Sequence, residues 1–394
     1  MNRRITFSSH CKACVVAVPV CLAMLGVTWS VIASSRLSHA PTPTGSRRIG
    51  TVHLQVVDHN RQDPYRMDGS RRELLLQLWY PTATVQECKI ADYASPQVWA
   101  YLSQITGVSL PRVQTNSCMG ASVAPGSHPV IVFSHGYTGM LTDSTFLFED
   151  LASRGYVVVS VAHTYETTVV EFPDARLIPS VLGSYLTDDL LADDQSLTQA
   201  LATRIADLGF VLNELAFLNS RSDNPFSGKL DVSRIGVMGH SLGAVAAIMS
   251  LAQEPRFRAA VMIDAPMLTS VKATTKPVLI LAAGRDQWTD DDCRLWNNLR
   301  GPRMAINLHG TEHLTPTDAV WLMGTVPGLA ISTGTMGSEK TVAAIRDYVA
   351  AFFDTNLLGR PVHPLSSGPS QNYPDADVIT HPQTLCQTDS STSR

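Results

Sequence analysis

The sequence carries little charge and no marked excess of either sign. Asp, Glu, Lys and Arg make up only 16% of the 394 residues, whereas about 25% is usual for soluble globular proteins. The net charge is −4, and no run of like charge stands out. Because nucleic-acid binding needs basic side chains that neutralise phosphates, this composition excludes that class of function. Hydrophobic residues make up 44%, which is enough for a large buried core.

The motifs that hold metals and nucleotides are also missing. The chain contains no HExxH pair and no GxxxxGK[ST] loop. Cysteine and histidine do not cluster beyond the N-terminal segment, and the Cys11 and Cys14 pair within it is part of an apolar leader. We therefore expect neither a metal ion nor a cofactor.

The N-terminal segment has the composition of an export signal. Arg3, Arg4 and Lys12 precede an uncharged stretch from Ala13 to Ser35. As a helix, this stretch would be about 30 Å long, which fits a cleaved signal peptide or a membrane anchor. We expect an exported protein that is secreted, periplasmic or anchored. The predicted parts are a leader over 1–40, a linker over 41–49, one domain over 50–360 and a polar tail over 361–394.

Four cysteines follow the leader, an even number in a chain predicted to reach an oxidising compartment. Three sets of pairings are possible. We favour Cys88 with Cys118, which closes a short loop, and Cys293 with Cys386, which would tie the tail to the domain. Unpaired buried thiols are the alternative.

Short apolar runs alternate with helical patterns along the central part of the chain. Apolar residues at spacings of three and four predict an amphipathic helix over 196–218, and a second helix closes the domain over 340–353. This alternation is typical of an α/β fold with a mostly parallel sheet and helices on both faces. We expect eight strands, over 51–57, 74–80, 129–135, 156–163, 234–240, 258–264, 277–284 and 304–310.

The pentapeptide GHSLG, residues 239–243, lies between a predicted strand and an alanine-rich helical pattern. This context predicts a nucleophile elbow, a strained turn that raises a serine hydroxyl above the sheet. Gly239 and Gly243 would leave room where side chains would collide. We therefore predict that Ser241 is a nucleophile rather than a helix-capping serine.

A serine hydroxyl needs a base to accept its proton and a carboxylate to orient that base. His313 follows the last predicted strand, where a loop can return over the serine, while His309 is expected to be a packed or solvated ring of the strand. Asp264 ends one strand between the serine and His313, and Asp286 follows the next strand. The residues alone leave both carboxylates open as the acid.

An acyl-transfer site also needs donors for the oxygen that becomes negative. The backbone N–H of Leu242, directly after the serine, is one expected donor, and that of Tyr137, in the loop SHGYTG, is the other. His135 and Gly136 belong to the same loop. We expect them to brace and turn the backbone rather than to react.

Six segments resemble the platelet-activating-factor acetylhydrolase group of α/β-hydrolases in order and spacing: SHGYTG, DLASRGYVVVSVAH, RIADLGFVLNEL, DVSRIGVMGHSLGA, MIDAPM and LHGTEH. The resemblance implies the α/β-hydrolase fold and places the acid after the sixth strand, at Asp264. The chain departs from the group at Ala244, where glycine is more frequent. GYTG, the elbow and Asp286 together also look like bacterial cutinases and polyester hydrolases. Both resemblances imply hydrolysis of a carboxylic ester through an acyl-serine, without a cofactor.

Two segments are candidates for the walls of a substrate pocket. Residues 165–195 leave a strand on an irregular path, and residues 314–332 place Trp321, Leu322 and Met323 soon after the base. These side chains could line an acyl pocket, touch a membrane surface or pack in the core. Our hypothesis is a serine esterase acting on lipid-like or short-acyl esters. A polyester hydrolase and a catalytically silent binding protein are the alternatives, and the oligomeric state stays open.

Overall fold

The computed structural model describes residues 38–83, 88–182, 194–265, 271–285, 287–323, 332–360 and 372–379. The chain divides into two units, Met1–Ser35 and Arg36–Arg394, and all described residues belong to the second. The predicted leader, with the choice between signal and anchor, lies outside the described residues, as do Asp286 and Cys386. Within the described ranges, no helix is long and apolar enough to cross a membrane.

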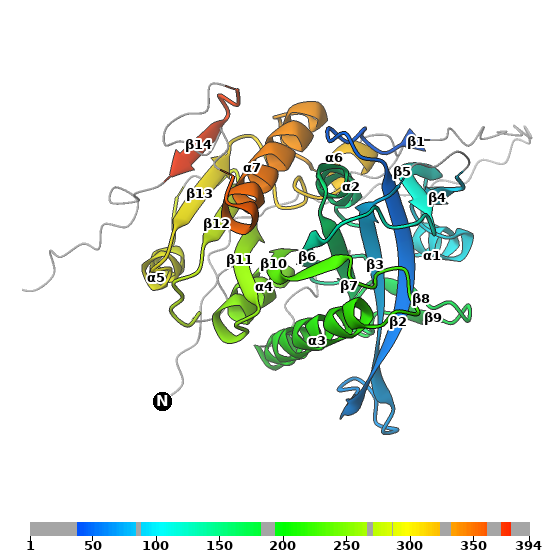
Figure 1. The fold of residues 1–394 in the computed structure, drawn as a ribbon. Helices are drawn as coiled ribbons and strands as arrows, with labels where there is room; N and C mark the ends of the chain where they lie inside the picture. The colour runs from blue at the N-terminus through cyan, green and yellow to red at the C-terminus, as the bar shows by residue number, and fades with distance from the viewer. Residues whose placement is uncertain are drawn as a thin grey trace, which may run out of the picture. The chain divides into compact units, whose positions relative to one another are not determined.

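A large mixed sheet forms the centre of the fold (Figure 1). All eight expected strands belong to it, and the last six of them along the chain pair in parallel, as predicted. The third and fourth of the eight along the chain exchange places in space. Their spatial order is β2 (Ile49–Gln62), β3 (Arg71–Pro81), β7 (Val157–Ala162), β6 (His128–Ser134), β10 (Leu230–His240), β11 (Phe257–Ile263), β12 (Val278–Ala283) and β13 (Arg303–Leu308).

The prediction of eight strands was too low, because the described residues alone form a sheet of 12. The additional strands are short or polar and lie toward the two edges, where pairing with a neighbour rather than an apolar pattern decides their structure. One comes from the expected leader and one from the expected tail, so the folded unit extends beyond residues 50–360. The four are β1 (Ser38–His39), β4 (Ile90–Asp92), β5 (Val113–Met119) and β14 (Ala376–Ile379).

Helices cover both faces of the sheet (Figure 1). Successive residues of β11 alternate between two apolar cores, since Ala260 and Met262 pack on one side and Val261 on the other. The first core contains α3 (Asp194–Ser220), α4 (Leu242–Gln253) and α5 (Asp290–Asn298). The second contains α2 (Thr145–Arg154), α6 (Ala319–Leu322) and α7 (Ser338–Leu358). The two predicted helices are thus α3 and α7.

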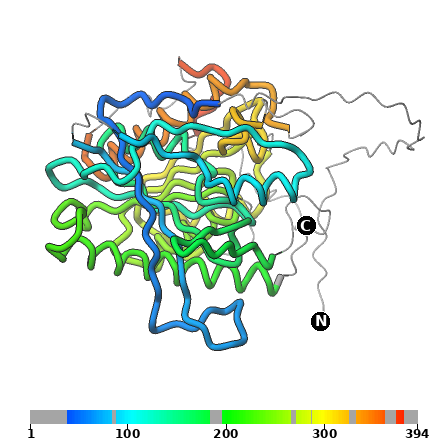
Figure 2. The backbone as a smooth tube through the Cα atoms, turned by 90° about the vertical axis from the view of Figure 1, so that its right-hand side faces the viewer, coloured from blue at the N-terminus to red at the C-terminus, as the bar shows by residue number. Residues whose placement is uncertain are grey.

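Helix α1 (Pro96–Thr106) was not predicted. Its boundaries do have a sequence signature: Ser95 caps the N-terminus, Pro96 occupies the first turn, and Gly107 ends the helix at φ 70°. The helix packs against β8 (Val169–Glu171), which forms a hairpin with β9 (Leu177–Pro179). Figure 2 shows a second, longer hairpin, between β2 and β3, that extends away from the other strands.

One of the two predicted disulfides is described completely. Cys88 and Cys118 are bonded, with a sequence separation of 30 residues, as expected. Cys293 is also disulfide-bonded, but its predicted partner, Cys386, lies outside the described residues. That second pairing therefore stays a prediction.

Candidate active site

Ser241 lies in a strained turn between β10 and α4. Its backbone has φ 54° and ψ −123°, a conformation that residues with a side chain rarely adopt. The two glycines around it permit the turn. A Cβ on Gly243 would lie 2.0 Å from the carbonyl oxygen of Ser134, and a Cβ on Gly239 would lie 2.3 Å from the carbonyl carbon of Gly243. The turn is therefore an elbow that only this pattern of small residues allows.

Three residues from distant parts of the chain meet at this elbow. His313 Nε2 lies 2.9 Å from Ser241 Oγ, and His313 Nδ1 lies 2.6 Å from Asp264 Oδ2. The imidazole thus bridges the hydroxyl and the carboxylate. Its side chain is 40% exposed, so the arrangement opens to solvent.

Asp264 is held rigidly at the end of β11. Its backbone is also in a strained region, with φ 41°, and its Oδ1 accepts a hydrogen bond from the Ala283 N–H at 3.1 Å. Burial opposes ionisation, but the hydrogen bond to His313 and the nearby Arg285 outweigh it and lower the pKa of Asp264. The carboxylate is therefore ionised and aimed at the ring, whereas Asp286, the alternative acid, lies outside the described residues.

The two predicted oxyanion donors flank the serine. Leu242 is the first residue of α4, where backbone N–H groups have no partner within the helix and the positive end of the helix dipole favours an anion. The loop of Tyr137 passes close to the serine, because a Cβ on Gly136 would lie 3.5 Å from Ser241 Cβ. Tyr137 and Ser241 line the same cavity.

That cavity has a volume of about 720 Å³, and aromatic and aliphatic side chains form much of its wall. Helix α1 supplies a wall that sequence reasoning missed, including Trp99, Leu102 and Ile105. Of the predicted walls, Leu322 and Met323 do line the cavity. Trp321 instead packs behind it, with its ring 6.3 Å from that of Tyr93 and its Nε1 donating to Asp318.

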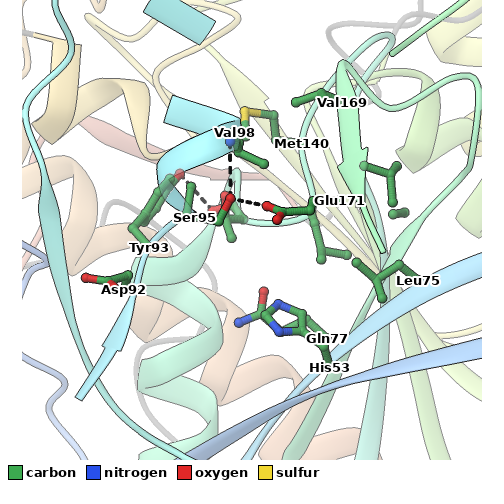
Figure 3. A pocket seen from close by; sticks show the side chains of 15 residues that line it. His53, Leu75, Gln77, Asp92, Tyr93, Ser95, Val98, Met140, Val169 and Glu171 are labelled. Atoms are coloured by element: carbon green, nitrogen blue, oxygen red, sulfur yellow. Dashed lines mark hydrogen bonds between the residues drawn. The ribbon is translucent and has the colours of Figure 1, made fainter. Parts of the chain in front are cut away.

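A second cavity, of about 100 Å³, lies beyond Tyr93 and Met140, which line both cavities. Figure 3 shows how α1 is attached there. Ser95 Oγ accepts from the Val98 N–H, which caps α1, and donates to Glu171 of β8. This hydrogen-bonded pair connects the wall of the large cavity to the β8–β9 hairpin.

Two other histidines, His309 and His135, lie outside this arrangement. His309 is a solvated ring just after β13, and its Nε2 pairs with Asp377 at 2.6 Å. His135 is fully buried. Its Nδ1 donates to the Gly136 carbonyl at 2.7 Å, and its Nε2 lies 2.7 Å from Thr167 Oγ1, so it braces the loop.

The core contains a second Ser–His–Asp array with the same hydrogen-bond pattern. His163 Nε2 lies 2.9 Å from Ser134 Oγ, and His163 Nδ1 lies 2.9 Å from Asp207. All three side chains are fully buried, so no ester can reach Ser134 without opening the core. Burial, rather than hydrogen-bond geometry, separates this array from the one at Ser241.

The exchanged strand order, the elbow and the exposed Ser–His–Asp arrangement define the class of this protein, an α/β-hydrolase. The family described as platelet-activating factor acetylhydrolase, isoform II, matches residues 34–173 and 199–358. The chain belongs to this family, as its motifs predicted.

Individual relatives are ester hydrolases. Platelet-activating factor acetylhydrolase of Gallus gallus is 26% identical over 53% of this chain and 57% of its own length. A probable 1-alkyl-2-acetylglycerophosphocholine esterase of Arthroderma benhamiae is 22% identical over 90% of this chain and 97% of its own. Cutinase est2 of Thermobifida alba is 25% identical over 48% of this chain and 54% of its own.

A solved structure extends the likeness to most of the fold. Ferulic acid esterase from Streptomyces cinnamoneus has a TM-score of 0.74 and 32% identity, and the match covers 87% of this chain and 99% of that one. Together, the family and these relatives establish that the protein is a serine carboxylic-ester hydrolase.

Proposed function

We propose that Ser241, His313 and Asp264 are the nucleophile, base and acid of this hydrolase, and that the N–H groups of Tyr137 and Leu242 bind the oxyanion. One observation carries the proposal. His313 bridges Ser241 at 2.9 Å and Asp264 at 2.6 Å, and the serine lines a cavity of about 720 Å³. The buried array at Ser134 also has a bridging histidine, but a substrate cannot reach its serine.

The reaction has two steps. Asp264 holds His313 as the tautomer with a proton on Nδ1, so that Nε2 can accept the proton of Ser241 as Oγ attacks the ester carbonyl carbon. The carbonyl oxygen becomes negative and receives hydrogen bonds from the two backbone donors. The intermediate then collapses, His313 gives its proton to the departing alcohol, and an acyl-serine remains. Water attacks the acyl carbon with His313 again as base, which releases the acid and restores the hydroxyl.

The shape of the cavity supports a substrate class. An apolar cavity of this size accommodates a bulky group on one side of the ester bond, which supports lipid-like esters with a short acyl chain, in keeping with the family. Tyr93, Trp99 and Tyr101 line the cavity. These rings, together with the likeness to a ferulic acid esterase, favour aromatic esters as a second candidate. The cutinase relatives keep polyester hydrolysis as the alternative.

The protein is further proposed to act after export. The apolar segment from Ala13 to Ser35 and the Cys88–Cys118 disulfide support an oxidising compartment outside the cytosol. Ile105, which lines the cavity, and Val181 are exposed apolar side chains that support contact with a lipid surface.

Substitution of the two comparable serines tests the assignment. Ser241→Ala should abolish labelling by a fluorophosphonate probe and lower kcat on a p-nitrophenyl ester by about 10⁶. The matched control, Ser134→Ala, removes a hydroxyl with the same hydrogen bond and should leave labelling intact. Labelling of the Ser241→Ala protein would overturn the proposal. A panel of acetyl-lipid, feruloyl and insoluble polyester substrates then ranks the three substrate classes.

A further inference from the structure

Arg204, on α3, inserts a fully buried guanidinium group beneath the loop that follows β6. Nη1 donates to the carbonyl of His135, and Nη2 donates to the carbonyl of Gly136 at 3.1 Å. Nε donates to Glu166 at 2.7 Å, and this carboxylate is fully buried as well. A buried charge is costly unless it is paired. The two side chains therefore form a neutral pair. The other two nitrogens of the Arg204 guanidinium group remain available to donate to the loop carbonyls.

The Gly136 carbonyl is held by more than this one donor. His135 Nδ1 donates to it at 2.7 Å, and the Gly139 N–H donates at 3.1 Å. Carbonyl oxygens have two lone pairs, so three donors fix the direction of this group more firmly than is usual. The plane of the peptide that joins Gly136 to Tyr137 is fixed with it.

The fixed carbonyl also directs the N–H of Tyr137. No cis peptide bond occurs in the described part of the chain, and in a trans peptide the C=O and N–H bonds point in opposite directions. A carbonyl turned toward Arg204 therefore directs the Tyr137 N–H to the other side of the loop. Gly136, Tyr137 and Ser241 line the large cavity on that side.

Donors on a peptide carbonyl also polarise the peptide. A cationic donor withdraws electron density from the carbonyl, which makes the N–H of the same peptide a stronger donor. An oxyanion hole depends on donors that are oriented and polarised before the reaction begins, because no reorganisation is then needed in the transition state.

From this geometry we infer that Arg204, neutralised by Glu166, is a positioning residue that orients and polarises the Tyr137 N–H for the oxyanion. The inference rests on the proposed function, in which this N–H binds the negative oxygen. Arg204 touches neither substrate nor Ser241, and it acts through the Gly136 carbonyl.

Arg204→Lys and Arg72→Lys form a matched pair of variants. Arg72 is also fully buried, but it binds Asp207, Asp63 and the Thr164 carbonyl instead of the loop. Lysine keeps the positive charge, but its ammonium group lacks the planar guanidinium geometry that donates to two carbonyls at once. Loss of one oxyanion donor lowers kcat about 10²-fold. We expect a loss of this size for Arg204→Lys, with KM staying within about threefold of the wild-type value. Arg72→Lys should keep kcat within about threefold of the wild type, even if it lowers thermal stability as much as Arg204→Lys does.

Two further readouts separate positioning from a general structural role. Phenylboronic acid, which becomes a tetrahedral anion on a serine, should bind the Arg204→Lys protein more weakly, in parallel with the loss in kcat. The pH profile of kcat should keep its shape, because the contact between His313 and Asp264 is untouched. Equal kcat losses in the two variants, or an Arg204→Lys protein with nearly wild-type kcat, would overturn the inference. Absence of fluorophosphonate label on Ser241 in the wild type would instead overturn the proposed function.

Thr167→Val tests the same peptide if the lysine variant does not fold. Thr167 Oγ1 lies 2.7 Å from His135 Nε2 and 3.1 Å from the His163 carbonyl oxygen, and its one proton is shared between them. Because the Gly136 carbonyl can only accept, the neutral His135 ring has its proton on Nδ1, and the Thr167 hydroxyl stabilises that tautomer by donating to Nε2. Without the Thr167 hydroxyl, the His135 ring should donate less effectively to the Gly136 carbonyl. We expect kcat to fall about tenfold with KM unchanged, which corresponds to the free energy of one ordinary hydrogen bond. An unchanged kcat would again overturn the inference.

Discussion

His240 Nε2 donates a hydrogen bond to the backbone carbonyl of His313 at 2.8 Å, and the two rings are 4.8 Å apart. The residue before the nucleophile thus holds the loop of the proposed base. Burial and the neighbouring His313 lower the pKa of His240 to about 4, so the ring is neutral at physiological pH. A carbonyl can only accept, which assigns the proton of the neutral ring to Nε2.

We expect His240→Phe to lower kcat about tenfold, because the loop of His313 loses one hydrogen bond while the core keeps a ring. His240→Gln, which keeps a donor, is the control and should lose less. Steady-state kinetics on one soluble ester measures both. Equal losses would show that the volume of the ring, rather than its hydrogen bond, matters.

We expect Asp264→Asn to lower kcat by about 10⁴, because an amide favours the wrong tautomer of His313 while leaving the fold intact. Asp286→Asn is the matched control. Because the Asp286→Asn substitution leaves the contact between Asp264 and His313 unchanged, its loss in kcat should stay within about tenfold. Kinetics with circular dichroism as a check on folding ranks the two, and the reverse order would move the acid to Asp286.

The binding of negatively charged substrates should depend on pH because of Asp143, which lines the large cavity. Burial raises its pKa to about 7, and the nearby Asp318 adds to the shift. The cavity therefore gains a negative charge as the pH rises through 7. KM for an ester with a carboxylate on its acyl chain should rise about fivefold over that range, since like charges repel. A neutral ester of equal length, and the Asp143→Asn variant with either ester, should show no such rise.

Trp99 should determine selectivity for bulky substrates. Its ring stacks on that of Tyr93, with centroids 5.8 Å apart, at the wall of the cavity. Trp99→Ala should raise KM about tenfold for feruloyl or long-chain esters, which bury apolar area against the ring. Acetyl esters of a small alcohol, measured on the same protein, should change less than about threefold. Equal changes in KM for both kinds of ester would show that Trp99 stabilises the fold rather than recognising bulky substrates.

Local pattern was sufficient for the features that depend on neighbouring residues. The eight strands follow from apolar runs, and the elbow follows from GHSLG because Gly239 and Gly243 alone permit the close approach of strand, turn and helix. Strands β5 and β14 have weak patterns of their own, and their pairing at the edges exists only in the assembled sheet.

The elbow serine and the order of its candidate partners along the chain follow from local sequence patterns. Only the tertiary structure brought Asp264 to His313, because Asp264 and Asp286 follow neighbouring strands with equal local patterns and the partner histidine is 49 residues from Asp264. The tertiary structure also decided which of two Ser–His–Asp arrays is accessible, since their hydrogen bonds are alike and only burial separates Ser134 from Ser241. The cavity wall formed by α1 depends on the same long-range packing, which no local pattern encodes.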